Sequence, residues 1–241
     1  RILMTEQLNI GGIAVDVVFK EIKNVHLSVH PPTGRIRIAA PTRMKLDTIR
    51  VYAISKLDWI RKEQAKLLAQ ERETEREYID RESHYLWGRR FLLRINEVDA
   101  PPSVTLLHSE ILLSVRPGSS PEKRAAVLSA WYRQAVRDAV KPMIPKWEKV
   151  MGVKVNRLFV QRMKTRWGSC NHAKGNIRLN TELAKKPKIC LEYILVHEMT
   201  HLLEASHNER FRGLMDQFMP QWRHHRDELN RSPLGFVAWE Y

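Results

Sequence analysis

The chain has 241 residues, 43% of them hydrophobic, which is enough to bury the core of one large domain or two small ones. Its 41 Lys and Arg outnumber its 27 Asp and Glu, so the net charge of +14 favours acidic partners such as nucleic acid, acidic membranes or acidic polypeptides. No apolar run approaches the roughly 20 residues of a membrane-spanning helix and the first residues lack a signal-peptide pattern, so we expect a soluble, unexported protein without membrane contact.

The first 118 residues have the patterns of a β-rich region that contains one long helix. Residues 7–40 alternate between apolar and polar side chains as strands do, with Pro31, Pro32 and Gly34 marking a hairpin turn. From residue 45 to about 77 the apolar residues change to helical spacing, and residues 84–116 return to strand patterns. We predict a first domain over residues 1–118.

The second predicted domain covers residues 119–241 and alternates helices with short strands. Its elements in chain order are a helix at 121–150, strands at 153–162 and 177–180, and helices at 188–205 and 208–218. Pro121 is well placed at the first helical position of the first of these. No internal repeat is visible in the sequence, and the mixture of elements predicts an α+β fold.

The strongly apolar helix leads into the stretch VHEMTHLLEASHNERF, residues 196–211. His197 and His201 lie four residues apart, so on a helix their side chains project one turn apart from nearly the same face and can bind one metal ion. Glu198 follows the first histidine, and in His-Glu-x-x-His helices this carboxylate acts as general base on the water at the metal. The pattern predicts two ligands and the base of a catalytic zinc site.

A catalytic zinc site uses three protein ligands and keeps the fourth position for water. We choose His207 as the third ligand, because it lies beyond a predicted helix end at Ala205 and a turn can bring its ring back to the metal. The competing third ligands are Glu204, Asp216 and Glu228.

Two other interpretations of the histidines are less favourable. Histidines on an apolar helix can be buried without a ligand, but burying two imidazoles and a carboxylate is costly unless a partner such as a divalent cation compensates. The spacing also equals that of the metzincins, which place a glycine where this chain has Glu204. No Met-turn follows either, so metzincin membership is disfavoured.

Four stretches together resemble the YgjP-like metallopeptidase family, which is related to the SprT-like and minigluzincin proteases. They are VHLSVHPPTGRIRIAAP at 25–41, RWGSC at 166–170, IRLN at 177–180 and the histidine motif. The resemblance covers most of the chain and implies a compact zincin-like domain, in which a small sheet packs on the active-site helix, after a β-rich region. It implies one zinc ion per chain, with His197, His201 and His207 as ligands and Glu198 as base.

The zincin resemblance also suggests how a peptide binds. In zincins the strand before the active-site helix often lies at the edge of the sheet and pairs with the substrate, and Ile177–Asn180 is the candidate for this strand.

The stretch RWGSC holds three further candidates. Trp167 and Gly168 are explained by packing and backbone freedom, whereas Arg166 is a candidate for stabilising the oxyanion or binding a substrate carboxylate. Cys170 is an alternative nucleophile or metal ligand, although packing explains a small buried thiol equally well. With Cys190 as the only other cysteine the chain has no disulfide framework, which favours a reducing compartment and a cytoplasmic location.

A basic stretch precedes the histidine motif. Residues 154–181 contain no acidic residue, and their seven basic ones are Lys154, Arg157, Arg162, Lys164, Arg166, Lys174 and Arg178. A solvated basic face explains this stretch most simply, and a groove for phosphate or an acidic partner is the functional alternative.

These patterns predict a zinc-dependent peptidase with a polypeptide substrate. Zinc lowers the pKa of a water to about 7 and polarises the peptide carbonyl, while Glu198 accepts the proton of that water and passes it to the leaving amine. Two alternatives stay open, namely a nucleic-acid-binding module with a structural or vestigial metal site, and a metal-dependent hydrolase of a non-peptide amide. The sequence carries no signal for the oligomeric state.

Overall fold

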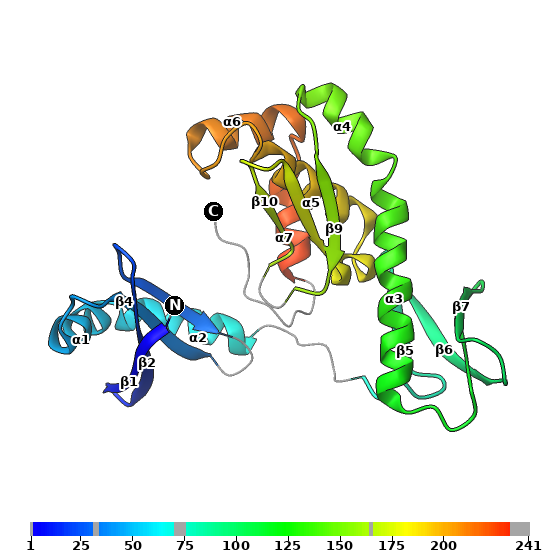
Figure 1. The fold of residues 1–241 in the computed structure, drawn as a ribbon, viewed down its shortest axis with the longest axis horizontal. Coiled ribbons are helices and arrows are strands. Elements are labelled where there is room, and N and C mark those ends of the chain that lie inside the picture. The colour runs from blue at the N-terminus through cyan, green and yellow to red at the C-terminus, as the bar shows by residue number, and fades with distance from the viewer. Residues whose placement is uncertain (1, 31–33, 70–75, 164–165, 232–241) are drawn as a thin grey trace. The chain divides into compact units, whose positions relative to one another are not determined.

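The computed structural model of the chain describes residues 2–30, 34–69, 76–163 and 166–231 (Figure 1). The described residues up to 69 form one compact unit and those from 76 onward form another. Both units combine helices with a β-sheet, so the fold is α+β as predicted. The predicted boundary after residue 118 lies inside the second unit, because strands that precede it pack on the helix that follows it.

In the first unit, a four-stranded sheet packs against two helices. Its strands are β1 (Ile2–Ile10), β2 (Ile13–Lys20), β3 (His26–His30) and β4 (Arg35–Pro41), in the order β1-β2-β4-β3. Neighbouring strands are antiparallel except β2 and β4, which are parallel. Val15, Val17, Ile36 and Ile38 alternate with less buried residues and form the core, as the two-residue period in the sequence predicts.

The helix predicted at 45–77 is instead two helices, α1 (Leu46–Ser55) and α2 (Leu57–Ala69), within the described part of the chain. The two helices are separated at Lys56, whose N–H donates to the carbonyl three residues earlier, that of Ala53, at 3.1 Å. With this break, Ile49 of α1 and Ile60 of α2 both reach the core beneath the sheet. Residues 70–75 lie outside the described residues, and 76–77 are not helical.

The second unit begins with a sheet of the same topology as the first. Its strands are β5 (Ser83–Leu86), β6 (Arg89–Glu97), β7 (Ser103–Leu106) and β8 (Glu110–Val115), in the order β5-β6-β8-β7. Only β6 and β8 are parallel, as β2 and β4 are in the first unit. A helix follows the fourth strand in both cases, so the structure contains a repeat that the sequence does not reveal.

The helix after β8 is α3 (Pro121–Val140), which begins as predicted with Pro121 in its first turn and with Ser120 accepting from the Lys123 N–H. The remaining elements are α4 (Met143–Met151), β9 (Arg157–Gln161), β10 (Gly168–Asn171), β11 (Asn176–Asn180), the 3-10 helix η1 (Thr181–Lys185), α5 (Lys188–Thr200), α6 (Glu209–Phe218) and α7 (Trp222–Arg231).

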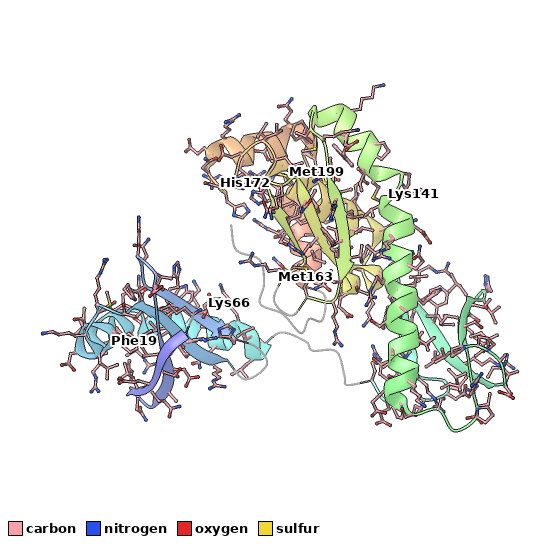
Figure 2. All side chains as sticks on the ribbon, in the orientation of Figure 1. Phe19, Lys66, Lys141, Met163, His172 and Met199 are labelled. Carbon is pink, nitrogen blue, oxygen red and sulfur yellow. The ribbon has the colours of Figure 1, made fainter. Side chains whose placement is uncertain are left out.

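The strands β9 to β11 form a three-stranded sheet that packs on α5. Its order is β10-β11-β9, with β10 antiparallel and β9 parallel to β11. In Figure 1, β9 and β10 lie in front of α5, which also contacts α3, α4, α6 and α7. Figure 2 labels Phe19 in the first unit and Met199 of α5 in the second, and both side chains are buried.

The sheet order corrects one prediction. Ile177–Asn180 belongs to β11, which is the central strand and is paired on both sides, so it cannot add a substrate strand. β10 is the edge strand next to it. The sequence alone does not give this order, because it is fixed by pairing between segments that are distant in the chain. None of the helices formed by the described residues has the length and apolar character needed to cross a membrane.

Candidate metal centre

The histidine motif lies at the end of the most deeply buried helix. On α5, Leu191, Ile194 and Val196 are fully buried, as the apolar sequence predicts. His197 and Glu198 occupy its last turns with 1% and 2% of their surfaces exposed, and His201 is the residue that ends the helix. Two polar groups are therefore held inside the protein by the burial of their apolar neighbours.

The structure brings His197, His201 and His207 together. One ring nitrogen of each lies within 4.8 Å of the others, and the Nε2 atoms of His197 and His207 are 3.1 Å apart. The chain leaves α5 after His201 and returns, so that His207, the most exposed of the three histidines but still partly covered, closes the cluster from a loop.

Phe211 and Asn208 place the returning segment. Asn208 caps α6 by accepting from the Phe211 N–H at 3.0 Å. The Phe211 ring is 1% exposed and lies 4.6 to 4.9 Å from the centroids of all three imidazoles. This ring is an apolar wall of the site, and no pattern in the sequence indicated that role beyond its place at the end of the motif.

All three imidazoles have lowered pKa values. Burial lowers the pKa of His197 well below its usual value, and the nearby His201 and His207 lower it further. Burial also lowers the pKa of His201, and burial together with His201 lowers that of His207 to about 4. Neutral imidazoles at physiological pH are the form that binds a metal ion.

The geometry of the cluster fits a zinc ion. Two nitrogens bound to tetrahedral zinc at about 2.05 Å lie about 3.3 Å apart, close to the separation of the His197 and His207 nitrogens. His201 Nδ1 lies 3.1 Å from the Glu204 carbonyl, an orientation that metal-bound histidines commonly have and that leaves Nε2 for the ion.

The competing third ligands have other partners. The Glu204 carboxylate accepts from the Ser206 N–H and lies 3.6 Å from Arg210. Asp216 accepts from the Trp222 indole N–H and pairs with Arg223. Neither these two residues nor Glu228 belongs to the group that the described residues offer to a metal.

Glu198 lies between the helix and the edge strand β10. A Cβ built on Gly168 would meet Glu198 Oε1 at 2.8 Å and Ile194 Cγ2 at 3.0 Å, so the strand backbone approaches the carboxylate directly. Burial raises the Glu198 pKa to about 8, and the positive charge of Arg166 opposes this rise. Gly168 is thus required for a close approach, since its φ is not in the left-handed region.

Arg166 and Cys170, the other candidates in the stretch RWGSC, lie near the Glu198 side chain. Arg166 is exposed and acts on Glu198 through its charge. Cys170 is half-buried, and burial together with Glu198 raises its pKa to about 12, so its thiol stays protonated at neutral pH and is a poor nucleophile. Trp167 is buried, as expected for a packing residue.

A family model described as YgjP-like, metallopeptidase domain, matches residues 23–232 of the chain. Among solved structures, the crystal structure of the metallopeptidase zymogen of Methanocaldococcus jannaschii jannalysin is 18% identical, with a TM-score of 0.32 over 39% of this chain and 92% of that chain. A likeness of this size does not by itself establish a shared fold. The comparison with curated proteins gave no match.

Proposed function

Since this chain belongs to the YgjP-like metallopeptidase family, we propose that it hydrolyses peptide bonds with one zinc ion held by His197, His201 and His207 and with Glu198 as general base. The observation that carries the proposal is the convergence of three imidazoles on one point, with the buried Glu198 side chain beside the first of them. When bound, zinc supplies Lewis acidity, which polarises the substrate carbonyl and acidifies a water.

The protein groups do the rest of the chemistry. Glu198 accepts a proton from the attacking water and donates it to the amine of the leaving product. Its position against Gly168 limits the movement of the carboxylate, so the proton acceptor stays near the edge strand. Arg166, exposed and close enough to influence Glu198, is the candidate donor for the oxyanion or for a substrate carboxylate.

The substrate is proposed to bind as an extended strand at the outer edge of β10, where the described part of the chain adds no further strand. β10 is the edge of its sheet, and Gly168 at its start touches Glu198. A peptide that pairs with this strand therefore passes beside the base. Unfolded or flexible polypeptide segments can adopt this conformation most readily, and we expect them to be the substrates.

The test measures metal and cleavage in the same preparations. Wild-type protein, Glu198→Gln and Glu209→Gln are loaded with zinc, quantified by plasma mass spectrometry and incubated with a library of internally quenched peptides. Glu209 is exposed in the first turn of α6 and controls for the loss of one carboxylate. We expect about one zinc per chain in all three and cleavage by all except Glu198→Gln.

Turnover by Glu198→Gln at the wild-type rate would refute the role of the base. Absence of stoichiometric zinc and of any zinc-dependent cleavage, together with salt-dependent binding to DNA, would favour the nucleic-acid module instead. Cleavage of small amides but of no peptide would favour the non-peptide hydrolase.

A further inference from the structure

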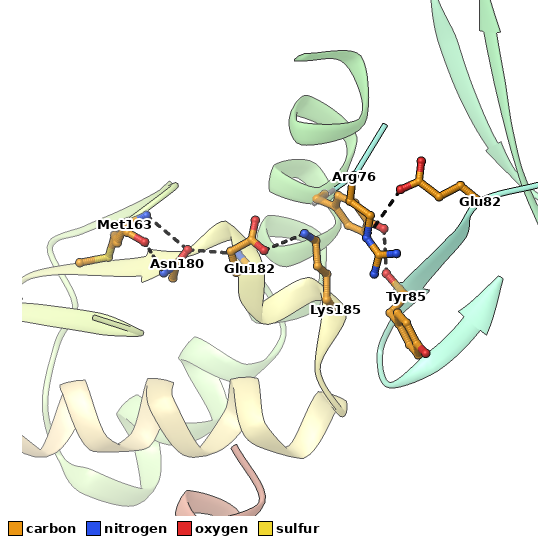
Figure 3. A network of polar contacts seen from close by, with 8 residues as sticks. Arg76, Glu82, Tyr85, Met163, Asn180, Glu182 and Lys185 are labelled. Atoms are coloured by element: carbon orange, nitrogen blue, oxygen red, sulfur yellow. Dashed lines mark hydrogen bonds and ion pairs between the residues drawn. The ribbon is translucent and has the colours of Figure 1, made fainter. Parts of the chain in front are cut away.

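Asn180, the last residue of β11, is the most extensively hydrogen-bonded side chain around the connection that leads to β10. It is 0% exposed. Its Nδ2 donates to the Met163 carbonyl at 3.0 Å and to the Arg166 carbonyl at 2.8 Å. Its Oδ1 accepts from the N–H groups of Met163 at 3.3 Å and Glu182 at 3.1 Å. Figure 3 shows Asn180 between Met163 and Glu182.

This set of contacts uses the full capacity of the amide, two donors and two acceptors. The two donated bonds join one buried side chain to both sides of the connection, Met163 after β9 and Arg166 before β10. A side chain of the same shape without donors leaves both carbonyls unsatisfied, which is unfavourable in a buried site. The position of Arg166 therefore depends on the Asn180 amide group.

The backbone of Asn180 holds the peptide group between Trp167 and Gly168. Its N–H donates to the Trp167 carbonyl at 2.8 Å, and Gly168 lies opposite Leu179 in the antiparallel pair. In this arrangement Gly168 and Leu179 are a non-hydrogen-bonded pair, so the N–H and C=O of Gly168 point away from β11, toward the side of β10 where the described residues place no further strand. Gly168 is also the residue that contacts Glu198.

We infer that Asn180 is a positioning residue for peptide hydrolysis, which sets the peptide groups at the start of β10 so that a bound substrate strand is held at the correct distance from Glu198. The inference rests on the proposed function. Asn180 acts through Arg166, Trp167 and Gly168 and does not touch the substrate. The side chain must be an amide, because at this buried position it donates to two carbonyls and accepts from two N–H groups.

The test compares Asn180→Asp and Asn180→Ala with wild type in the full-length, zinc-loaded protein. Asp has the shape of Asn and keeps both accepted bonds, but it loses both donors and places a carboxylate against two carbonyl oxygens. Asn176→Ala is the matched control, since Asn176 begins the same strand and its buried Oδ1 has no hydrogen-bond partner among the described residues. Zinc content, thermal unfolding, kcat and KM are measured with the library peptide that wild type cleaves fastest.

We expect both Asn180 variants to bind zinc like wild type and to lose on the order of 100-fold in kcat, with a smaller change in KM. The substrate still pairs with β10, but its scissile bond is displaced from Glu198. Asn180→Asp is expected to be no better than Asn180→Ala, whereas a role in packing alone predicts that the isosteric Asp retains activity. Asn176→Ala should match wild type.

Three results would overturn the inference. A fully active Asn180→Asp, in a wild type that cleaves peptide, removes the role of the amide and leaves the proposed function intact. Loss of zinc or of cooperative unfolding in both variants makes Asn180 a residue of the fold rather than of positioning. A wild type that holds zinc but cleaves no peptide refutes the proposed function itself, and the inference with it.

Discussion

Gly168→Ala is the substitution whose effect follows most directly from the structure. The added Cβ would lie 2.8 Å from Glu198 Oε1, 2.9 Å from Glu198 Cγ and 3.0 Å from Ile194 Cγ2. Nonbonded carbon contacts normally lie at about 3.5 to 4.0 Å, so something must move by about 0.5 Å or more. Ile194 is fully buried and Glu198 nearly so, which leaves neither side chain room to withdraw.

Two consequences follow, one for stability and one for activity. Overpacking of a close-packed site typically lowers the free energy of unfolding by about 1 to 3 kcal/mol. If the structure relaxes by moving the Glu198 side chain or the start of β10, the proposed base and the proposed substrate strand separate, and a displacement of about 1 Å can lower kcat on the order of 100-fold. The backbone φ of Gly168 is not left-handed, so steric contact is the cause.

Urea unfolding, zinc content and peptide cleavage measure these effects together. Gly213→Ala is the matched control, because Gly213 lies within α6 and a Cβ there meets no other part of the described structure within 4 Å. We expect this control to keep its activity and to gain about 0.5 to 1 kcal/mol of stability, as helical glycine to alanine changes do. A Gly168→Ala variant with wild-type stability and wild-type kcat would refute the close approach to Glu198.

Three further predictions concern zinc, pH and a partly buried carboxylate contact. Zinc at about 100 times its Kd should raise the free energy of unfolding by about 2.7 kcal/mol, which calorimetry detects as a higher Tm that a chelator or His201→Ala abolishes. Burial lowers the pKa of His84 to about 4, so the unfolded chain binds a proton more readily between that value and 6.5. Chelated protein should therefore lose up to about 3 kcal/mol as the pH falls through this window, and urea titrations of His84→Gln should show a smaller loss. Glu192→Ala should lower stability by about 1 to 3 kcal/mol in the same assay, because it removes the acceptor of the Trp147 indole N–H at 2.9 Å.

The parts of the site that could be predicted depend on contacts that are close in the sequence. His197 and His201 are one helical turn apart, so helical periodicity alone places their side chains together. The strands of the first unit were predictable for the same reason, because alternate burial of Val15 and Val17 is a local signal. Family membership also follows from short motifs that the sequence displays directly.

The parts that could not be predicted depend on contacts between distant segments. β11 is central because β9 and β10 pair with it from both sides, and nothing within Ile177–Asn180 encodes two partners rather than one. The break at Lys56 arises because two helices share one core, although the pattern of apolar residues is continuous across it. The repeated four-strand topology is hidden because many apolar residues can fill equivalent core positions.

Glu198, the proposed general base, illustrates why the His-Glu-x-x-His motif alone does not define the chemistry of the site. His-Glu-x-x-His places Glu198 next to the first proposed ligand, yet the environment of its carboxyl group includes β10, which lies 27 to 30 residues earlier in the chain. Gly168 supplies the space, Asn180 holds the Arg166 and Trp167 carbonyls that precede that glycine, and burial raises the carboxyl pKa. A chain with the same motif but a side chain at position 168 could bind the metal and still hold its base in the wrong place. We therefore expect activity to depend on the edge strand as much as on the motif helix.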